Sequence, residues 1–528
     1  MEKIAIIYLD APGMEEQLMA LRVPEGMEIQ LLSVPASETN LAEAFQQAME
    51  QSDARYKVYI SANIEILEND ILPRMIEAFQ QHPNIGLLGL SGTKRVLTSG
   101  ITYTSPQRIG IALDEASRPL VGRTAKRSCE DVQVLDGYLL ATQQDVAWRK
   151  DIVHGSLFLG AAASVEHRRA GYDVAVLAEA APACRLPDEL TADDGEQDAF
   201  LDEYSADLYP LVSVVIPTYQ RPDYFRQSLG SAQRQTYRHL DIFVTDNSHN
   251  EETKAVYEES FADDPRIHYE FHPDFDAAGN WGRAGEYDNP RAEYVNWLMD
   301  DDLFAPQKIA TMMDCYFQYP DVTLVTSYRS MIDGEGNALP DAPWTQPLCE
   351  TTSRLSGNDV GGLVLRKMVN YIGEPTTVLI RKKYMNNNQL GWTGKEGKYR
   401  ISDFPTWLCL LSQGDMIYIR EPLSTFRLHG NQQQYSVETN FSGMICWSMM
   451  MREAIGRNLF LQTDEDKQEA IIHWMDVATG NLQILQNYPK DIWNTSYVQD
   501  LLKVYAGMAA ALSNGYQIEY AIDTTPEK

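Results

Sequence analysis

Three consecutive carboxylates follow a predicted buried strand near the middle of the chain. Residues 294–299 are apolar enough for such a strand, and Asp300, Asp301 and Asp302 come directly after it. Adjacent like charges raise the free energy of a folded chain unless a cation lies between them. Mg²⁺ and Mn²⁺ bind carboxylate oxygens and bridge them to phosphate oxygens. The pattern therefore predicts a divalent-metal site, and a solvated acidic turn is the alternative.

Polar residues also follow two other predicted strands of this region. Residues 212–216 are rich in Val and Ile and lead into residues 217–222 (PTYQRP), and the strand at 240–245 is followed by Asp246. In a doubly wound sheet these positions meet at the carboxyl edge, where nucleotides bind. The two segments therefore predict a nucleotide site. A simple turn and a helix-capping Asp246 are the alternatives.

Asp403 lies among aromatic and aliphatic neighbours, just before a predicted helix at 406–412. Apolar surroundings raise the basicity of a carboxylate, as a general base requires. A helix N-cap is the alternative. Farther on, Arg427 and His429 supply a cation and an imidazole, either of which can meet a diphosphate or a metal, although a single His is more often structural.

The elements that must position these residues form two α/β regions. Short apolar strands alternate with helical segments in residues 1–186 and again in 209–432, which indicates an α/β fold in each. Residues 187–208 are dense in Asp and Glu and predict a linker. Residues 433–528 show apolar residues at three and four spacing, which predicts a helical C-terminal region.

The two α/β regions resemble each other in the order of their elements. In the first, a strand at 57–60 leads to Ser61-Ala62-Asn63 and then to a helix that ends before His82-Pro83; in the second, a strand leads to the three acids and to a similar helix. The first region has no carboxylate at the turn that corresponds to the acids.

Charge and cysteine content exclude several classes of protein. The chain has 75 acidic and 44 basic side chains, a formal charge of −31, which repels nucleic acid and anionic lipid. The same charge repels a nucleoside diphosphate, so a site for one requires a cation or local Arg and Lys. The six cysteines form no C-x-x-C pair, which argues against a zinc or disulfide framework. Without a signal-peptide pattern or a membrane-length apolar run, the sequence predicts a cytoplasmic protein.

Taken together and in this order, the motifs of residues 209–432 resemble those of family 2 glycosyltransferases with the GT-A fold. The resemblance rests on segments 212–222, 235–237, 241–253, 294–306 and 371–429. It implies two tandem GT-A, Rossmann-like domains of the nucleotide-diphospho-sugar transferase type, followed by the helical region.

The resemblance also implies roles for individual residues. Asp403 would be the catalytic base of an inverting transfer, and a divalent cation, Mn²⁺ or Mg²⁺, would be held by Asp301, Asp302 and His429. The family pattern is usually D-x-D, so the choice among the three consecutive acids stays open. The residues expected to bind the nucleotide sugar are Pro217, Thr218, Tyr219, Arg221, Asp246, Asn280, Arg283, Asp300 and Arg427.

The first region is similar to a glycosyltransferase-like GT-A family through segments 135–137, 148–151 and 164–172. That family usually carries acids where this chain has Ser61-Ala62-Asn63 and Gly160-Ala161-Ala162-Ala163. The first region is therefore expected to be a degenerate copy that binds acceptor, serves as a scaffold or dimerises. A metal-free activity that uses Asp136 or Glu65 is the alternative.

The expected function is an inverting glycosyltransferase that moves a sugar from a nucleotide-diphosphate donor to an acceptor hydroxyl in bacterial surface glycan or glycoprotein assembly. The acceptor could be a glycan, a lipid-linked intermediate or a protein, and the chain could form a homo-oligomer. Two alternatives stay open. One is a sugar nucleotidyltransferase, although no Gly-rich phosphate loop is present; the other is a non-catalytic carbohydrate-binding or assembly protein that keeps the fold.

Overall fold

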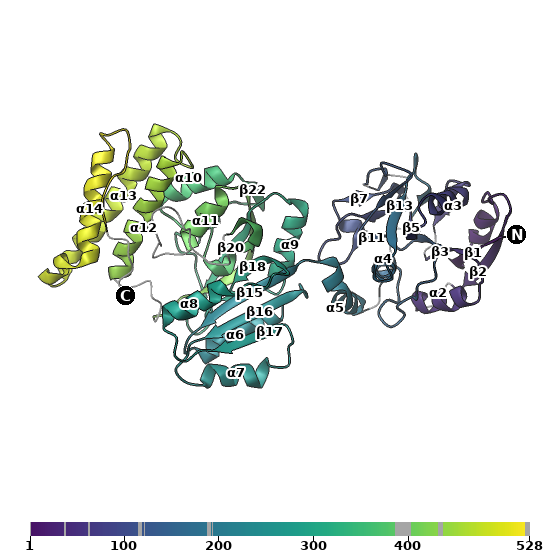
Figure 1. Cartoon of the computed structure of the whole chain (residues 1–528), viewed down its shortest axis with the longest axis horizontal. Helices are drawn as coiled ribbons and strands as arrows, with labels where there is room; N and C mark the ends of the chain where they lie inside the picture. The colour runs from purple at the N-terminus through teal and green to yellow at the C-terminus, as the bar shows by residue number, and fades with distance from the viewer. Residues whose placement is uncertain are drawn as a thin grey trace. The chain divides into compact units, whose positions relative to one another are not determined.

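The chain forms two compact units, Met1–Tyr209 and Pro210–Lys528 (Figure 1). The computed structural model describes residues 2–522 except 36–38, 62–63, 115–118, 121, 187–191, 193, 386–402 and 431–436. Each unit is an α/β domain with its own main sheet, which confirms the predicted fold class. Within the described ranges, no helix combines the length and hydropathy needed to span a bilayer.

The main sheet of the first unit contains β1 (Glu2–Leu9), β2 (Met27–Val34), β3 (Tyr56–Ile60), β5 (Ile85–Gly89), β10 (Cys129–Asp131), β12 (Leu139–Thr142) and β13 (Asp173–Leu177). Their order across the sheet is β10-β13-β5-β12-β3-β1-β2. β1 pairs in parallel with β2 and β3, whereas β12 runs antiparallel to β3 and β5. Every residue of β3 and β5 is buried, as expected for strands covered on both faces.

Short strands form two further small sheets in the first unit. One contains β6 (Gly92–Thr93), β7 (Arg108–Ile109) and β11 (Val134–Leu135), and the other β4 (Glu65–Ile66), β8 (Ala112–Leu113), β9 (Pro119–Leu120) and β14 (Cys184–Arg185). The helices are α1 (Met14–Met19), α2 (Leu41–Glu50), α3 (Ile71–Gln81), α4 (Leu159–Arg169) and α5 (Glu196–Leu208), with a 3-10 turn, η1, at Thr102–Thr104. Apolar residues recur along one face of α3, so this helix packs its apolar stripe on the core.

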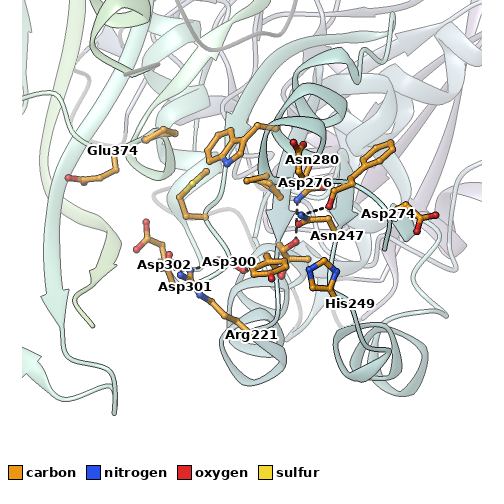
Figure 2. A pocket seen from close by; sticks show the side chains of 18 of the residues that line it. Arg221, Asn247, His249, Asp274, Asp276, Asn280, Asp300, Asp301, Asp302 and Glu374 are labelled. Atoms are coloured by element: carbon orange, nitrogen blue, oxygen red, sulfur yellow. Dashed lines mark hydrogen bonds and ion pairs between the residues drawn. The ribbon is translucent and has the colours of Figure 1, made fainter. Parts of the chain in front are cut away.

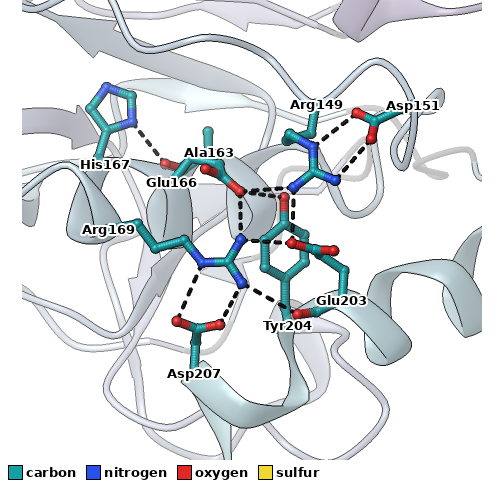
Figure 3. A network of polar contacts seen from close by, with 9 residues as sticks. All are labelled: Arg149, Asp151, Ala163, Glu166, His167, Arg169, Glu203, Tyr204 and Asp207. Carbon is teal, nitrogen blue, oxygen red and sulfur yellow. Dashed lines mark hydrogen bonds and ion pairs between the residues drawn. The ribbon is translucent and has the colours of Figure 1, made fainter.

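The acidic stretch predicted as a linker contains α5, which packs on the first unit. Phe200 and Tyr204 are fully buried, and Phe200 stacks on Phe158 at 4.9 Å. The acids of α5 pair with basic residues from elsewhere in the unit: Glu203 lies 2.9 Å from Arg149 and 2.7 Å from Arg169 (Figure 3). The linker prediction is therefore wrong for residues 196–208, because their charge is neutralised on one side while their aromatic stripe is buried.

The sheet of the second unit begins with parallel strands and continues with mixed ones. Its strands are β15 (Leu211–Thr218), β16 (Leu240–Asp246), β17 (Ile267–Phe271), β18 (Ala292–Trp297), β19 (Leu303–Phe304), β20 (Leu324–Ile332), β21 (Ala338–Leu339), β22 (Ser353–Leu355), β23 (Leu379–Arg381) and β24 (Met416–Arg427). The main order is β17-β16-β15-β18-β23-β20-β24-β19. β15 pairs in parallel with β16 and β18, so the carboxyl ends of these three strands meet at one edge.

Helices alternate with these strands along the chain. They are α6 (Pro222–Gln233), α7 (Glu252–Ser260), α8 (Ala277–Glu286), α9 (Lys308–Gln318), α10 (Gly357–Lys367) and α11 (Asp403–Leu411), with 3-10 turns η2 (Pro375–Thr377) and η3 (Lys382–Tyr384). Pro222 occupies the first turn of α6, where a missing backbone N–H costs nothing. Asp276 caps α8, accepting a hydrogen bond from the backbone N–H of Gly279 at 2.7 Å.

The predicted helical C-terminal region is confirmed, and it shares a core with the second α/β domain. It contains α12 (Val437–Gly456), α13 (Asp464–Ile484) and α14 (Ser496–Ala511), with short 3-10 turns η5 (Leu485–Asn487) and η6 (Lys490–Asn494) between the last two. These helices lie together beside α10 (Figure 1). Met450 and Met451 are fully buried in the cluster that also contains Trp407 of α11. Helices and domain therefore form one compact unit.

Candidate active site

A cavity of about 720 Å³ opens at the carboxyl ends of β15, β16 and β18 (Figure 2). Parallel strands bring residues that are far apart in the sequence to this edge of the sheet. The lining residues are Pro217, Thr218, Tyr219, Arg221, Asn247, His249, Asp274, Phe275, Asp276, Ala277, Asn280, Trp281, Met299, Asp300, Asp301, Asp302, Glu374, Pro375 and Phe426.

Asp300 joins the end of β15 to the acidic turn. Its carboxylate accepts hydrogen bonds from the Thr218 hydroxyl at 3.0 Å and from the backbone N–H of Tyr219 at 3.2 Å, and it lies 3.1 Å from Nη1 of Arg221. Burial raises the pKa of Asp300 to about 6, and the charge of Asp301 contributes to this rise, while Arg221 opposes both. Asp300 therefore links the strand end, the acids and a cation.

Asp301 carries the carboxylate on which a cation and an imidazole converge. Its Oδ2 lies 2.9 Å from Nη1 of Arg221 and 2.9 Å from Nε2 of His429. Both Asp301 and His429 are largely shielded from solvent. The structure thus brings together the predicted residues Arg221, Asp301 and His429, although they lie up to 208 positions apart in the chain.

The side chain of Asp302 is buried, with 1% of its surface exposed, and both of its carboxylate oxygens accept hydrogen bonds. It accepts hydrogen bonds from the Thr376 hydroxyl at 2.7 Å and from the backbone N–H of Arg427 at 3.0 Å. Burial raises its pKa well above the ordinary value, and the charge of Asp301 adds to this. Both oxygens of Asp302 therefore have protein partners, so its side chain fixes the acidic turn.

Arg427 does not line the cavity; it holds the acidic turn from behind. It is 1% exposed, and its Nε donates to the backbone oxygen of Asp301 at 2.8 Å while Nη2 donates to Gln227 at 2.8 Å. Its guanidinium also lies 4.6 Å from the ring centroid of Tyr224. The structure therefore assigns Arg427 to supporting the turn, and the predicted direct contact with the nucleotide sugar is not what its position provides.

Asp301 and His429 are the side chains best placed to hold a divalent cation. They offer a carboxylate oxygen and an imidazole nitrogen 2.9 Å apart, and Mn²⁺ accepts both kinds of donor. Among the described residues, no group of three or more His, Cys, Asp or Glu side chains converges on one point. A cation at this pair would need further ligands from water or from a bound diphosphate.

Aromatic and amide side chains line the end of the cavity away from the acidic turn, where Figure 2 labels Asn247, His249 and Asn280. Tyr219 is half exposed and meets the His249 ring edge-on at 5.6 Å. Asn247 donates to the backbone oxygen of Phe275 at 3.1 Å, which fixes the wall between them. Asn280 is buried and donates to the backbone oxygen of Thr218 at 3.2 Å. This end offers a ring face and amides, which suit a nucleobase and a ribose.

Besides Arg427, two other predicted nucleotide-binding residues lie outside the cavity lining. Asp246 is fully buried at the end of β16, where it accepts hydrogen bonds from the backbone N–H of Ser248 at 2.8 Å and from the Tyr269 hydroxyl. Arg283 forms two bonds of 2.7 Å to Glu270. Both residues lie near the edge of the sheet that the sequence predicted. However, Tyr269 and Glu270 of β17 form hydrogen bonds with them.

Asp403 is the first residue of α11 and is half-buried. Burial raises its pKa to about 6; the backbone N–H of Phe404 opposes this and the charge of Glu374 adds to it. Asp403 is not part of the cavity lining, whereas Glu374 is. The predicted base is thus a weakly acidic carboxyl within electrostatic reach of a cavity residue.

Glu374 and Trp281 line the cavity but were not among the predicted site residues. Glu374 belongs to the segment 373–376, whose Gly and Pro signal a fixed turn but do not say which way the acid points. Trp281 follows the predicted Asn280 in α8, and the period of that helix gives no sign of its exposure. Asn247, His249 and Asp274 follow strands of the sheet, and this strand-end position is the signal that could have identified them.

The two acids that the sequence offered for the first unit are both paired with arginines. Asp136 is buried, pairs with Arg108 and accepts a hydrogen bond from the Thr102 hydroxyl. Glu65 pairs with Arg185. Ala62 and Asn63 lie outside the described residues. Both acids offered as alternatives are therefore committed to basic partners.

Each unit matches a family of known proteins. Residues 13–204 match the family described as "Glycosyltransferase like family", and residues 213–383 match "Glycosyl transferase family 2". The first match ends inside α5, in agreement with the assignment of that helix to the first unit. The two matches confirm the predicted tandem arrangement.

Several bacterial proteins, among them named glycosyltransferases, share sequence similarity with this chain. An uncharacterized glycosyltransferase of Rickettsia conorii is 31% identical over 25% of this chain and 21% of its own length. GalNAc(5)-diNAcBac-PP-undecaprenol beta-1,3-glucosyltransferase of Campylobacter jejuni is 30% identical over 20% of this chain and 34% of its own length. Chondroitin synthase of Escherichia coli is 27% identical over 25% of this chain and 19% of its own length. The matched region thus spans well under half of each of these relatives.

Among solved structures, the UDP complex of S. aureus TarS residues 1–349 superposes with a TM-score of 0.39 and 12% identity, over 58% of this chain and 89% of the other.

Proposed function

Because this chain carries a glycosyltransferase-like domain followed by a family 2 glycosyltransferase domain, we propose that it transfers a sugar from a nucleoside-diphosphate donor to an acceptor hydroxyl. One observation carries the proposal. The cavity of the second unit has a ring face and amides at one end and Arg221 and Asp301 at the acidic turn, and His429 lies 2.9 Å from Asp301. A nucleoside and a diphosphate require these two kinds of surroundings next to each other.

We propose that the donor diphosphate binds at the acidic turn. Arg221 offers a guanidinium, which binds phosphate oxygens through several N–H groups, and it already lies 2.9 Å from Asp301. A divalent cation, Mn²⁺ or Mg²⁺, would be held by Asp301 and His429, with Asp302 keeping the turn in shape. When bound, such a cation neutralises charge that grows on the leaving diphosphate. Asp300 holds Thr218 and Arg221 beside the acidic turn through a hydrogen bond and an ion pair.

Asp403 is proposed as the general base of an inverting transfer. With a pKa of about 6, it is mostly ionised at neutral pH and still basic enough to accept the proton of an acceptor hydroxyl. The acceptor oxygen attacks the anomeric carbon from the face opposite the leaving diphosphate, so one displacement inverts that centre. Positioning of the two substrates contributes much of the rate in such a reaction.

The first unit is proposed to be non-catalytic. Its acid Asp136 is paired with Arg108, and Glu65 with Arg185, so neither offers a free carboxylate to a substrate or cation. It is left to bind acceptor, to serve as a scaffold or to form a homo-oligomer. The bacterial relatives support a role in glycan assembly. We propose that this is surface glycan or glycoprotein assembly, with a glycan, lipid-linked or protein acceptor.

A screen of nucleotide sugars tests the proposed activity. The protein is incubated with each donor, with and without Mn²⁺, and released nucleoside diphosphate is measured. We expect Mn²⁺-dependent release with at least one donor, and a loss of at least about a hundredfold in Asp301→Ala and Asp403→Ala, in line with the usual size of metal and base contributions. Asp263→Ala, which removes an exposed acid of the same unit, is expected to keep wild-type release. Wild-type release by Asp403→Ala would show that another group is the base.

A further inference from the structure

Glu374 lines the cavity but has no role in the proposed metal binding or in the proposed proton transfer. In Figure 2 it lies at the Asp302 end of the labelled row, and Asn247, His249 and Asp274 lie at the other end. If the base of the donor meets the aromatic end and its diphosphate the acidic turn, as in the proposed function, the sugar extends toward Glu374. The following inference rests on that proposed function.

A buried arginine forms an ion pair with Glu374. Nε of Arg329 lies 2.7 Å from Oε2 of Glu374, and Arg329 is 3% exposed. The guanidinium is held in turn, because its Nη2 donates to the backbone oxygens of Trp344 at 3.0 Å and Asn370 at 3.1 Å. Among the described residues, Oε1 of Glu374 has no such partner, so one carboxylate oxygen remains available in the cavity.

The turn that carries Glu374 is joined directly to the acidic turn. The backbone oxygen of Glu374 accepts a hydrogen bond from the backbone N–H of Thr377 at 2.8 Å, which closes η2. Within η2, the Thr376 hydroxyl donates to Asp302 at 2.7 Å and accepts from the backbone N–H of Met299 at 3.1 Å. Gly373 permits the turn with a φ of +111°, where a Cβ atom would lie 2.2 Å from the Thr377 hydroxyl. Glu374 therefore keeps a fixed position relative to the acids.

Trp281 adds an aromatic face to the lining of the cavity. Trp281 lies nearly parallel to the buried Trp297, with 5.5 Å between ring centroids and 12° between planes, and it is 39% exposed. A large ring held flat against another ring presents apolar area at little entropic cost. Few polar groups on an otherwise apolar wall are the usual means by which a pocket orients its ligand.

We infer that Glu374 selects the sugar of the donor: it accepts hydrogen bonds from hydroxyls of a neutral sugar and excludes sugars that carry a carboxylate. An ionised carboxylate is an acceptor only, so it pairs with hydroxyl or amide N–H donors. A hexuronic acid brings a second negative charge into the end of the cavity that already holds Glu374, and like charges across an interface are strongly unfavourable.

Binding measurements test this inference without an acceptor. Calorimetry compares UDP-glucose with UDP-glucuronic acid, and GDP-mannose with GDP-mannuronic acid, each in Mn²⁺, with UDP and GDP as references. We expect the wild type to bind the neutral member of the pair whose base it accepts at least about tenfold more tightly. In Glu374→Gln we expect this ratio to fall to about threefold or less, with the affinity for the free nucleotide unchanged. Glu293→Gln removes the same charge from an exposed position and is expected to keep the wild-type ratio.

A second variant separates recognition from misfolding. Glu374→Asp keeps the charge but retracts it by one methylene, so we expect it to go on excluding the hexuronic acid while binding the neutral sugar more weakly. A wild type that binds both members of a pair equally, or a Glu374→Gln variant that discriminates as the wild type does, overturns the inference. A wild type that binds neither UDP nor GDP instead overturns the proposed function itself.

Discussion

Replacing Asp403 by Asn is expected to abolish transfer and, at the same time, to stabilise the second unit. The folded chain raises the pKa of this carboxyl from 3.8 to about 6, chiefly by burial. A difference of about two pKa units corresponds to roughly 3 kcal/mol of folding free energy lost on ionisation. Because the side chain is half-buried, solvent screening reduces this, and we expect a gain of about 1–3 kcal/mol. The Asn side chain keeps the shape and can still accept the hydrogen bond from the N–H of Phe404.

The gain has a defined pH dependence. A carboxyl with a raised pKa binds its proton more tightly in the folded chain, so its destabilising effect is small near pH 4, grows as the pH rises and is complete above about pH 6. Asp403→Asn should therefore exceed the wild type in stability at pH 8 and approach it near pH 4.

Urea unfolding followed by tryptophan fluorescence measures this directly, because eight of the nine tryptophans follow residue 209 and report on the second unit. Asp263→Asn, at an exposed position, is the matched control and is expected to change neither stability nor turnover. An Asp403→Asn variant that is less stable than the wild type at pH 8, or a stability difference that does not vary with pH, would refute the assigned burial of this carboxyl. Retained turnover would refute its role.

Four further outcomes are expected. The kcat/KM of transfer should fall about tenfold per pH unit below pH 6, since Asp403 has to be ionised, and a profile that stays flat down to pH 5 would contradict this. Arg427→Met should destabilise the second unit by about 3 kcal/mol, because it leaves the backbone oxygen of Asp301 and the Gln227 amide without a donor; an unchanged urea midpoint would argue against the support role. Phe200→Ala should destabilise the first unit by about 3–5 kcal/mol through the cavity it leaves, whereas a true linker would tolerate it, as circular dichroism during unfolding can show. His429→Ala should raise the Mn²⁺ concentration for half-maximal turnover by about tenfold or more, and an unaltered metal titration would place the cation elsewhere.

The sequence was sufficient to predict where the strands end. Val- and Ile-rich segments locate β15 and β16, and the carboxyl ends of parallel strands must meet, so the strand pattern alone puts Thr218 and Asp300 at one edge of the sheet. Their hydrogen bond of 3.0 Å is the structural consequence.

The sequence was not sufficient to predict the hydrogen-bond and ion-pair partners of each side chain. Asp246 lies at the expected strand end, but a tyrosine from β17 takes one of its oxygens, and Arg283 finds Glu270 on that same strand. Asp302 and Arg427 likewise support the acidic turn. Asp302 accepts a hydrogen bond from the Thr376 hydroxyl, and Arg427 donates one to the backbone oxygen of Asp301. These pairings depend on contacts between segments that are remote in sequence, which no local pattern encodes.

Composition was misleading where charge and burial coexist on one helix. Residues 196–208 look like a linker because acids dominate their composition, yet Phe200 and Tyr204 form a buried stripe. Arg149 and Arg169, which come from other elements, neutralise Glu203. A charge count records the acids but not the partners that the fold brings to them.

The most direct test of the account is a crystal structure of the protein soaked with UDP or GDP and Mn²⁺. The account predicts a nucleoside diphosphate in the cavity, with its base beside Tyr219 and His249, its phosphates beside Arg221, and the cation within bonding distance of Asp301. An empty cavity at saturating nucleotide, or a nucleotide bound away from Asp301, would contradict it.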